Sequence, residues 1–144
     1  MLFRSVSPDR LYGMAYFGGD HGYGTIFYVQ YPNGSGWQAI GGVTKIHDFD
    51  GIRGANPNGD LLLGSDGLMY GLTTNGGAYQ KGVVFRIDPN INTYEVIFNF
   101  RNDSAPGTSI SSGSLPYGNL IQTSNGSFYG MTASGLAGLY TGTI

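Results

Sequence analysis

One segment of this chain occurs three times, and that repetition limits the fold more than any other feature. Residues 12–27 return as 70–85 and, at most positions, as 129–144. Each copy begins with Tyr-Gly, continues through one or two further glycines and ends with a glycine before a short apolar run. The opening residues Tyr12, Tyr70 and Tyr129 lie 58 and 59 residues apart. Because this period is slightly longer than that of usual propeller blades and too long for most solenoids, the chain is a tandem array of large units.

The second copy contains four candidate strands. Residues 61–64 run into the turn Ser65-Asp66-Gly67, which favours a hairpin with 68–73 as the return strand. A glycine-rich loop then leads to the β-branched strand 83–87. The turn Asp88-Pro89-Asn90 precedes a fourth strand over 94–100. Four sequential antiparallel strands in one unit are typical of a propeller blade.

The other two copies follow the same order. Strands are expected over 2–5, 11–13 and 44–49 in the first copy, and a hairpin joins 120–123 to 127–130 in the third. We therefore predict an all-β, β-propeller-like fold with about three four-stranded antiparallel blades per chain, the last one incomplete. The predicted units are residues 1–50, 51–103 and 104–144, and residues 104–114 form a solvated loop between blades.

Composition supports this fold and excludes several partners. The chain has 26 glycines, 11 tyrosines and 8 phenylalanines in 144 residues but only 11% charged residues, which suits short aromatic strands and tight turns. A net charge of −2 without a basic stripe argues against nucleic acid. No apolar run approaches the roughly 20 residues that span a membrane. The chain has no cysteine, and its start, Met1–Arg4, does not resemble a signal peptide.

An incomplete set of blades has open edges. Closed propellers have typically 4 to 8 blades, and unpaired strand edges invite association. We therefore expect either a homo-oligomer, with a dimer supplying about six blades, or a piece of a longer repeat chain. A partner's terminus could supply the missing strand.

The motifs resemble those of bacterial proteins that carry the GloVer repeat. The matching elements are a Tyr-Gly-x-Thr-Thr segment at 70–74, Gly76-Gly77 and the Gly-Val-Val-Phe run at 82–85, with Asn56-Pro57 and Leu115-Pro116 upstream of the first strands. Ala15 and Leu136 depart from the family pattern. The resemblance covers nearly the whole chain. It implies an extracellular or cell-surface propeller-like array without an assigned catalytic activity, and it transfers no functional residue.

The loop 16–23 is the most function-like segment. Tyr16, Phe17, Asp20, His21 and Tyr23 bring aromatic rings, a carboxylate and an imidazole together on one loop. Sugar binding uses this mixture, because a ring meets the C–H face of a pyranose while polar groups bind its hydroxyls. However, Ala78 and Tyr79 replace the acid and the histidine in the next copy, so the alternative is a simple glycine-rich crossover loop.

Three further positions have a structural and a functional interpretation. Trp37, the sole tryptophan, either packs between blades or supports a ligand, and Tyr79 is a second loop aromatic. The segment His47-Asp48-Phe49-Asp50-Gly51 contains a fragment of a calcium loop but lacks the remaining ligands, so we predict no metal and no cofactor.

Two recurrent positions are best explained by structure. The turn residues Asp9, Asp66 and Asn125 suit hairpin geometry, and the interchange of Asp and Asn argues against proton transfer. The recurrent tyrosines 12, 70 and 129 are expected in the blade cores, with each hydroxyl bonded to a neighbouring backbone group.

Three functions remain open. The first is a non-enzymatic extracellular module that binds or displays something on its repeated faces, with a glycan or another protein as partner. The second is a lectin that binds about one glycan per repeat through aromatics such as Tyr23 and Tyr79. The third is a glycoside hydrolase or lyase, which needs two facing carboxylates, for which Asp20 and Asp48 are the best pair. No catalytic residue is predicted.

Overall fold

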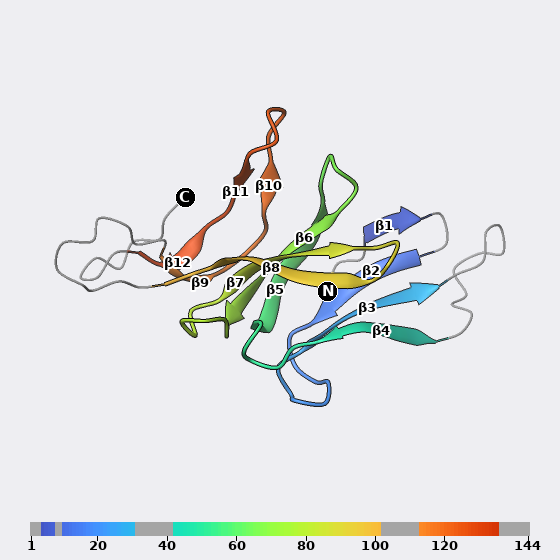
Figure 1. Ribbon diagram of the computed structural model, residues 1–144, viewed down its shortest axis with the longest axis horizontal. Coiled ribbons are helices and arrows are strands. Elements are labelled where there is room, and N and C mark those ends of the chain that lie inside the picture. Colours follow the sequence, from blue (N-terminus) through green and yellow to red (C-terminus); the bar gives the residue numbers. More distant parts are fainter. Residues whose placement is uncertain (1–3, 8–9, 31–41, 102–112, 136–144) are drawn as a thin grey trace.

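The computed structural model describes residues 4–7, 10–30, 42–101 and 113–135. Within these ranges all regular elements are strands, and there is no helix (Figure 1). The strands are β1 Arg4–Ser7, β2 Arg10–Ala15, β3 Thr25–Gln30, β4 Val43–Asp48, β5 Ala55–Leu63, β6 Met69–Asn75, β7 Val83–Asp88, β8 Thr93–Asn99, β9 Ser114–Pro116, β10 Ile121–Gln122, β11 Phe128–Tyr129 and β12 Thr132–Ser134.

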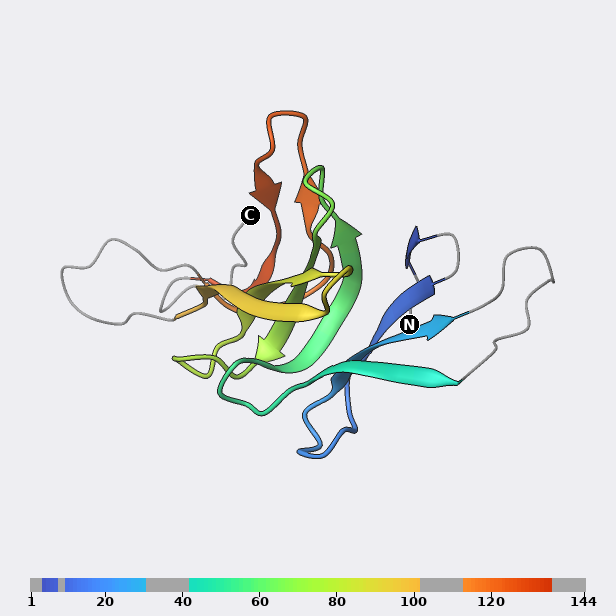
Figure 2. The same cartoon turned by 45° about the vertical axis from the view of Figure 1, so that its right-hand side comes forward.

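Two four-stranded antiparallel sheets follow each other along the chain. The first has the order β1-β2-β3-β4 and the second the order β5-β6-β7-β8, so every strand pairs with its neighbours in sequence. The sheets lie side by side in chain order, with β9 to β12 beyond the second sheet (Figures 1 and 2). The prediction of an all-β fold with antiparallel four-stranded units is thus confirmed. The proposed unit boundaries stay a prediction.

The third repeat reproduces the first two strands of the second. Its ladder β9–β12 pairs Pro116 with Thr132, as Pro57 pairs with Thr73 in β5–β6. Its hairpin β10–β11 pairs Ile121 with Tyr129, the counterpart of Leu62 with Tyr70. Because β5 has an irregular register between Asn58 and Leu62, the third repeat divides at the same place into two short ladders.

Two sequence-based boundaries were wrong. The strand predicted to begin at Leu61 begins at Ala55, because Ala55 pairs with Asn75 and Pro57 with Thr73 before the irregularity. Ser114, assigned to the solvated loop 104–114, is buried at the start of β9. Residues 104–112 and the first two residues of the predicted strand 2–5 lie outside the described residues.

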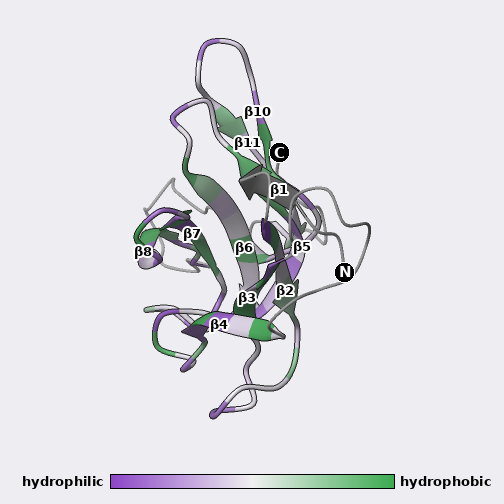
Figure 3. Cartoon of the chain, turned by 90° about the vertical axis from the view of Figure 1, so that its right-hand side faces the viewer, coloured by the Kyte–Doolittle hydropathy of each residue, from purple (hydrophilic) through white to green (hydrophobic). Residues whose placement is uncertain are grey.

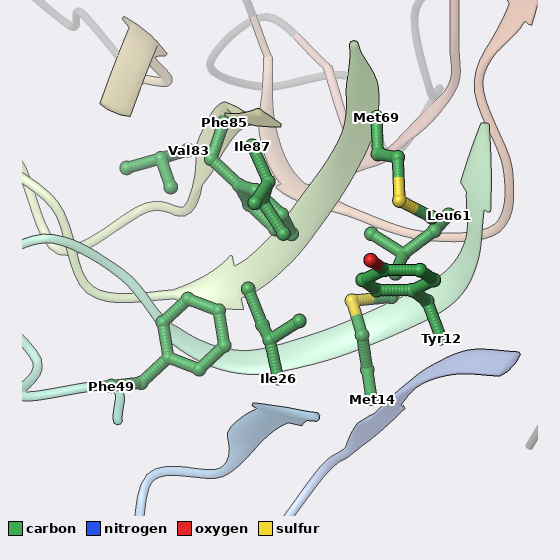
Figure 4. Close-up of a cluster of buried hydrophobic side chains, with 9 residues drawn as sticks. All are labelled: Tyr12, Met14, Ile26, Phe49, Leu61, Met69, Val83, Phe85 and Ile87. Carbon is green, nitrogen blue, oxygen red and sulfur yellow. The ribbon is translucent and has the colours of Figure 1, made fainter. Parts of the chain in front are cut away.

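The main core lies between the first and second sheets. Burial of one large apolar side chain contributes about 1.5–3 kcal/mol to the free energy of folding. The side chains converge from both sheets and from the β4–β5 connection, as Figure 4 shows. The cluster consists of Tyr12, Met14, Ile26, Phe49, Leu61, Met69, Val83, Phe85 and Ile87. A second, smaller cluster joins the second sheet to the third repeat through Tyr70, Leu72 and Leu120.

The recurrent tyrosines have three different environments. Tyr12 is buried, and its hydroxyl donates to the Pro89 carbonyl of the second repeat at 3.2 Å, as predicted. Tyr70 is also buried, but its hydroxyl donates to the Asp66 carboxylate at 2.6 Å rather than to backbone. The core prediction was wrong for Tyr129, which is 47% exposed. Within the described residues, no further repeat covers Tyr129 as the third repeat covers Tyr70.

The hairpin residues perform the turn role predicted for them. Asp66 Oδ1 accepts the Leu68 N–H at 3.1 Å, and Asn125 Oδ1 accepts the Ser127 N–H at 3.0 Å. Both bonds bridge two residues across a turn, which Asp and Asn perform equally well. The tip of the β10–β11 hairpin carries hydrophilic residues, whereas the strands carry both hydrophilic and hydrophobic ones (Figure 3). Asp9 lies outside the described residues.

Successive repeats meet where a proline covers a glycine. A Cβ added to Gly24 would lie 2.7 Å from Cδ of Pro57, and one added to Gly82 would lie 2.6 Å from Cδ of Pro116. Both glycines have a positive φ, 99° and 96°. Only a glycine combines this backbone conformation with so close an approach. We call these contacts the first and second repeat joints.

The same backbone hydrogen bonds accompany both joints. The Asn56 N–H donates to the Tyr23 carbonyl at 2.7 Å, and the Leu115 N–H donates to the Lys81 carbonyl at 3.1 Å. Asn56 and Leu115 both have a positive φ, 58° and 56°. A leucine is unusual in this conformation, since its Cβ makes the left-handed region costly. The joint geometry, rather than the local sequence, therefore determines the backbone here.

The joints predict a difference between two glycine substitutions. Gly18→Ala meets open space at a φ of 97° and should cost only the left-handed strain of about 1–2 kcal/mol. Gly82→Ala has nearly the same φ but should cost about 1–3 kcal/mol more, because its methyl overlaps both the Thr73 carbonyl oxygen and the Pro116 ring. Urea unfolding of the two variants measures the difference, and equal losses would show that the joint is not tightly packed.

Candidate functional site

The β2–β3 loop and the β6–β7 loop have the same backbone conformation. Gly24 N–H donates to the Gly18 carbonyl at 2.9 Å, and Gly82 N–H donates to the Gly76 carbonyl at 3.0 Å. Even the non-glycine Gln80, at a φ of 56°, repeats the positive φ of its counterpart in the first loop. The loop frame is therefore repeated, while its exposed side chains differ from copy to copy.

A side chain from the fourth strand of each sheet supports each loop. The Asp48 carboxylate accepts the Asp20 N–H at 2.8 Å, and the Asn99 amide oxygen accepts the Ala78 N–H at 2.9 Å. Since an amide replaces the carboxylate in the second copy, the shared requirement is a hydrogen-bond acceptor rather than a negative charge.

Asp20 and Asp48, the best carboxylate pair for an enzyme, share one cation. Lys45 Nζ lies 2.8 Å from Asp20 and 2.6 Å from Asp48. The Asp20 N–H and the Lys45 ammonium hold the pKa of Asp48 down to about 2. The two carboxylates raise the pKa of Lys45 in turn. Asp48 is thus held ionised as a loop support.

Two substitutions of Asp48 separate its acceptor role from its charge. Asp48→Asn keeps the acceptor that Asn99 provides in the second repeat, whereas Asp48→Ala removes it. We expect Asp48→Ala to lose about 1–2 kcal/mol more unfolding free energy at pH 7 than Asp48→Asn. Because the lowered pKa stabilises the fold above about pH 4, the wild type should lose this contribution between pH 4 and 2. Equal stability of the variants would contradict the acceptor role.

The aromatic residues of the first loop are exposed. Phe17 is 72% exposed, and its ring meets the Tyr16 ring edge to face, with centroids 4.6 Å apart. Tyr23 is also exposed and lies over Gly51 of the β4–β5 connection. In sum, the structure brings Tyr16 and Phe17 together, and it places Tyr23 against a different connection.

The remaining predicted residues are spread out. His21 is exposed on the first loop. Tyr79, its counterpart in the second repeat, is exposed and has the Arg101 guanidinium 5.9 Å from its ring centroid. Trp37 lies outside the described residues. The second loop is bonded to the β4–β5 connection, because Gly77 N–H donates to the Gly51 carbonyl at 3.1 Å.

A groove of about 420 Å³ lies beside Tyr16 and Phe17, at the first repeat joint. It runs between the end of β2 and the beginning of β5 and is lined by Met14, Ala15, Tyr16, Phe17, Pro57, Asn58 and Gly59. Sequence analysis identified only two of these residues. The other wall comes from the next repeat, some 40 residues further along the chain. The Asn-Pro element upstream of each first strand was the available signal for it.

Asp50 also has a structural role. Its carboxylate accepts the N–H groups of Ile52 at 3.0 Å and Arg53 at 2.8 Å, and it pairs with the Arg53 guanidinium at 3.2 Å. The calcium-loop fragment is therefore a turn closed by its own backbone. In the described part of the chain, no group of three or more His, Asp or Glu side chains is placed to hold a metal ion.

His47 lies in the sheet interface rather than at the loops. It is 8% exposed and stacks on the Tyr94 ring of β8, with centroids 3.7 Å apart and planes 4° apart. The Phe49 ring meets it edge to face. Its Nε2 has no hydrogen-bond partner in the described structure. Burial, followed by the positive charge of Arg53, lowers the pKa of His47 from 6.5 to about 4, although Asp48 and Asp50 oppose this shift.

The buried histidine predicts acid sensitivity in a defined range. Because His47 binds a proton less readily when folded, stability is complete above about pH 6.5 and falls as the pH approaches 4. At about 1.4 kcal/mol per pKa unit, the loss approaches about 3 kcal/mol. His47→Phe, which installs the residue type found at Phe98 in the second repeat, should abolish this slope in urea unfolding.

The control for this experiment is the exposed His21. His21→Gln should keep the wild-type dependence of stability on pH between 6.5 and 4. If His47→Phe kept that dependence too, the histidine in the interface would not be its source.

Comparison with known proteins gives one match. The family model described as the Gloeobacter/Verrucomicrobia repeat matches residues 3–144. No curated protein and no solved structure matches the chain. The described residues contain no helix long and apolar enough to cross a membrane. Since the family match covers nearly all of the sequence, and each repeat begins with the same strand pair, the chain belongs to the Gloeobacter/Verrucomicrobia repeat family.

Proposed function

We propose that this chain is a non-enzymatic binding module built on a β-propeller-like scaffold. Each four-stranded sheet is one blade, and consecutive blades pack face to face around the core cluster. The proposal rests on a contrast between the backbone and the side chains of the β2–β3 and β6–β7 loops. Their backbone is fixed by repeated hydrogen bonds, whereas their large aromatic side chains are exposed. Exposed aromatics on rigid loops favour recognition of a partner.

A glycan is the partner class that the loop chemistry favours. Tyr16, Phe17, Tyr23 and Tyr79 offer exposed ring faces on which a sugar can pack. Catalysis is less well supported, because Asp20 and Asp48 are bridged by Lys45 and support a loop. In this proposal the module acts outside the cell or on its surface, as the family resemblance implies.

The module extends through further blades, from a second copy of the chain or from a longer array. Tyr129 and Met131 occupy the positions of Tyr70 and Leu72, which are buried against the third repeat. In the third repeat the same positions are 47% and 57% exposed. A following blade would cover them as the third repeat covers Tyr70 and Leu72. This arrangement also removes the open sheet edge that invites aggregation.

The proposal predicts binding without turnover. We expect the chain to retain members of a panel of neutral and acidic oligosaccharides, and the recovered oligosaccharides to be unchanged in mass. The loop swap Tyr23→Lys/Tyr79→His installs the residue types found at Lys81 and His21 on the same backbone, so it should fold normally. Binding at the loops should weaken in this variant. Shorter products that disappear in Asp20→Asn/Asp48→Asn would instead establish a hydrolase or lyase.

A further inference from the structure

The groove at the first repeat joint has walls of different character. One wall carries Tyr16 and Phe17 at the end of β2, and the other carries Pro57, Asn58 and Gly59 at the beginning of β5. Met14 and Ala15 complete the lining. At about 420 Å³ the groove falls within the roughly 300–1,000 Å³ typical of small-molecule sites.

The lining selects a neutral ligand with both apolar and polar faces. None of the seven lining residues carries a charge. The Asn58 side-chain amide makes no hydrogen bond to another described residue, and an amide can both donate to and accept from a hydroxyl. The nearby Asp20 and Asp48 carboxylates are already paired with Lys45. A charged ligand would therefore find no counter-ion here.

The fold itself does not require the two aromatic residues. Thr74 and Asn75 hold the same positions in the second repeat, where Thr74 is buried and the Asn75 amide donates to Asn56 Oδ1 at 3.1 Å. The loops that follow have the same backbone in both repeats. A 72% exposed phenylalanine in place of an asparagine thus contributes little to folding and leaves a hydrophobic face in water.

We propose that this groove is a saccharide subsite, in which a neutral pyranose ring packs its C–H face on Phe17 and Tyr16 while its hydroxyls bond to Asn58. The inference rests on the proposed binding function and makes it specific. Because the second repeat has Thr74 and Asn75 and the third has Ala133 and Ser134 at these positions, this aromatic pair occurs once in the chain. The groove therefore binds one saccharide per chain, not one per repeat.

The matched variant is Tyr16→Thr/Phe17→Asn. It installs the residues of the second repeat on a backbone that already accepts them, so its urea midpoint should equal that of the wild type. Asn58→Ala removes the polar contact without touching the aromatic pair. Ile91→Thr is the control, since Ile91 is exposed in the β7–β8 turn and lines neither the groove nor the aromatic loops.

Amide-resolved NMR titration tests the proposal with the full chain. The probes are maltotetraose, cellotetraose and mannotetraose as neutral saccharides and tetragalacturonate as an acidic one. We expect at least one neutral probe to shift the Asn58 side-chain amide and the residues 14–17, saturating at one equivalent. Tyr16→Thr/Phe17→Asn should weaken that binding at least about tenfold, the fold-change given by about 1.4 kcal/mol. Ile91→Thr should leave it unchanged.

Three results would overturn the inference. Neutral probes that shift only the Tyr23 and Tyr79 loops would leave the binding function intact but place the site elsewhere. Tighter binding of tetragalacturonate in the groove would show that the ligand is acidic. No groove shift by any probe at millimolar concentration would remove the saccharide site, while the turnover assay on the same oligosaccharides decides the proposed function separately.

Discussion

The close approach of a proline to a glycine at each repeat joint is the constraint on which the rest depends. Pro57 covers Gly24 and Pro116 covers Gly82, with no room for a Cβ at either glycine. The neighbouring backbone hydrogen bond fixes the start of the next repeat against the end of the previous loop. Through this contact the core side chains of one sheet face those of the next, so burial of the core and placement of the groove have one cause.

The joint also explains why the loops keep one backbone conformation while their side chains differ between repeats. Because backbone groups and glycines hold the loop frame, the side chains at its tip are free to differ, as His21 and Tyr79 do. Asp48 and Asn99 show the same division, since either provides the acceptor that the loop needs. A fold built in this way can change its surface chemistry without changing its backbone.

The fold was largely predictable from the sequence because its signals are local. Turn residues at Asp66 and Asn125, β-branched runs and the repeat period are each contained in a few neighbouring residues. The groove was not predictable, because Asn58 approaches Tyr16 and Phe17 only through the joint. The early start of β5 was missed because its first residues lack a strand pattern in the sequence. Pro57 is uncommon inside strands, and Asn56 has a positive φ. The sequence assigned His47 no role, because its packing against Tyr94 depends on a strand about 50 residues further along the chain.

The two repeat joints distribute aromatic residues in opposite ways. At the first joint the earlier repeat supplies Tyr16 and Phe17, and the later repeat supplies the smaller Asn58. At the second, the earlier repeat has Thr74 and Asn75, and the exposed Tyr117 holds the position of Asn58. Since aromatic rings on both walls would fill a groove of about 420 Å³, a ring on one wall with a small polar residue opposite keeps it open. The residues that differ between these two repeats therefore face each other across a joint, and the joint, rather than the single repeat, determines how open this part of the surface is.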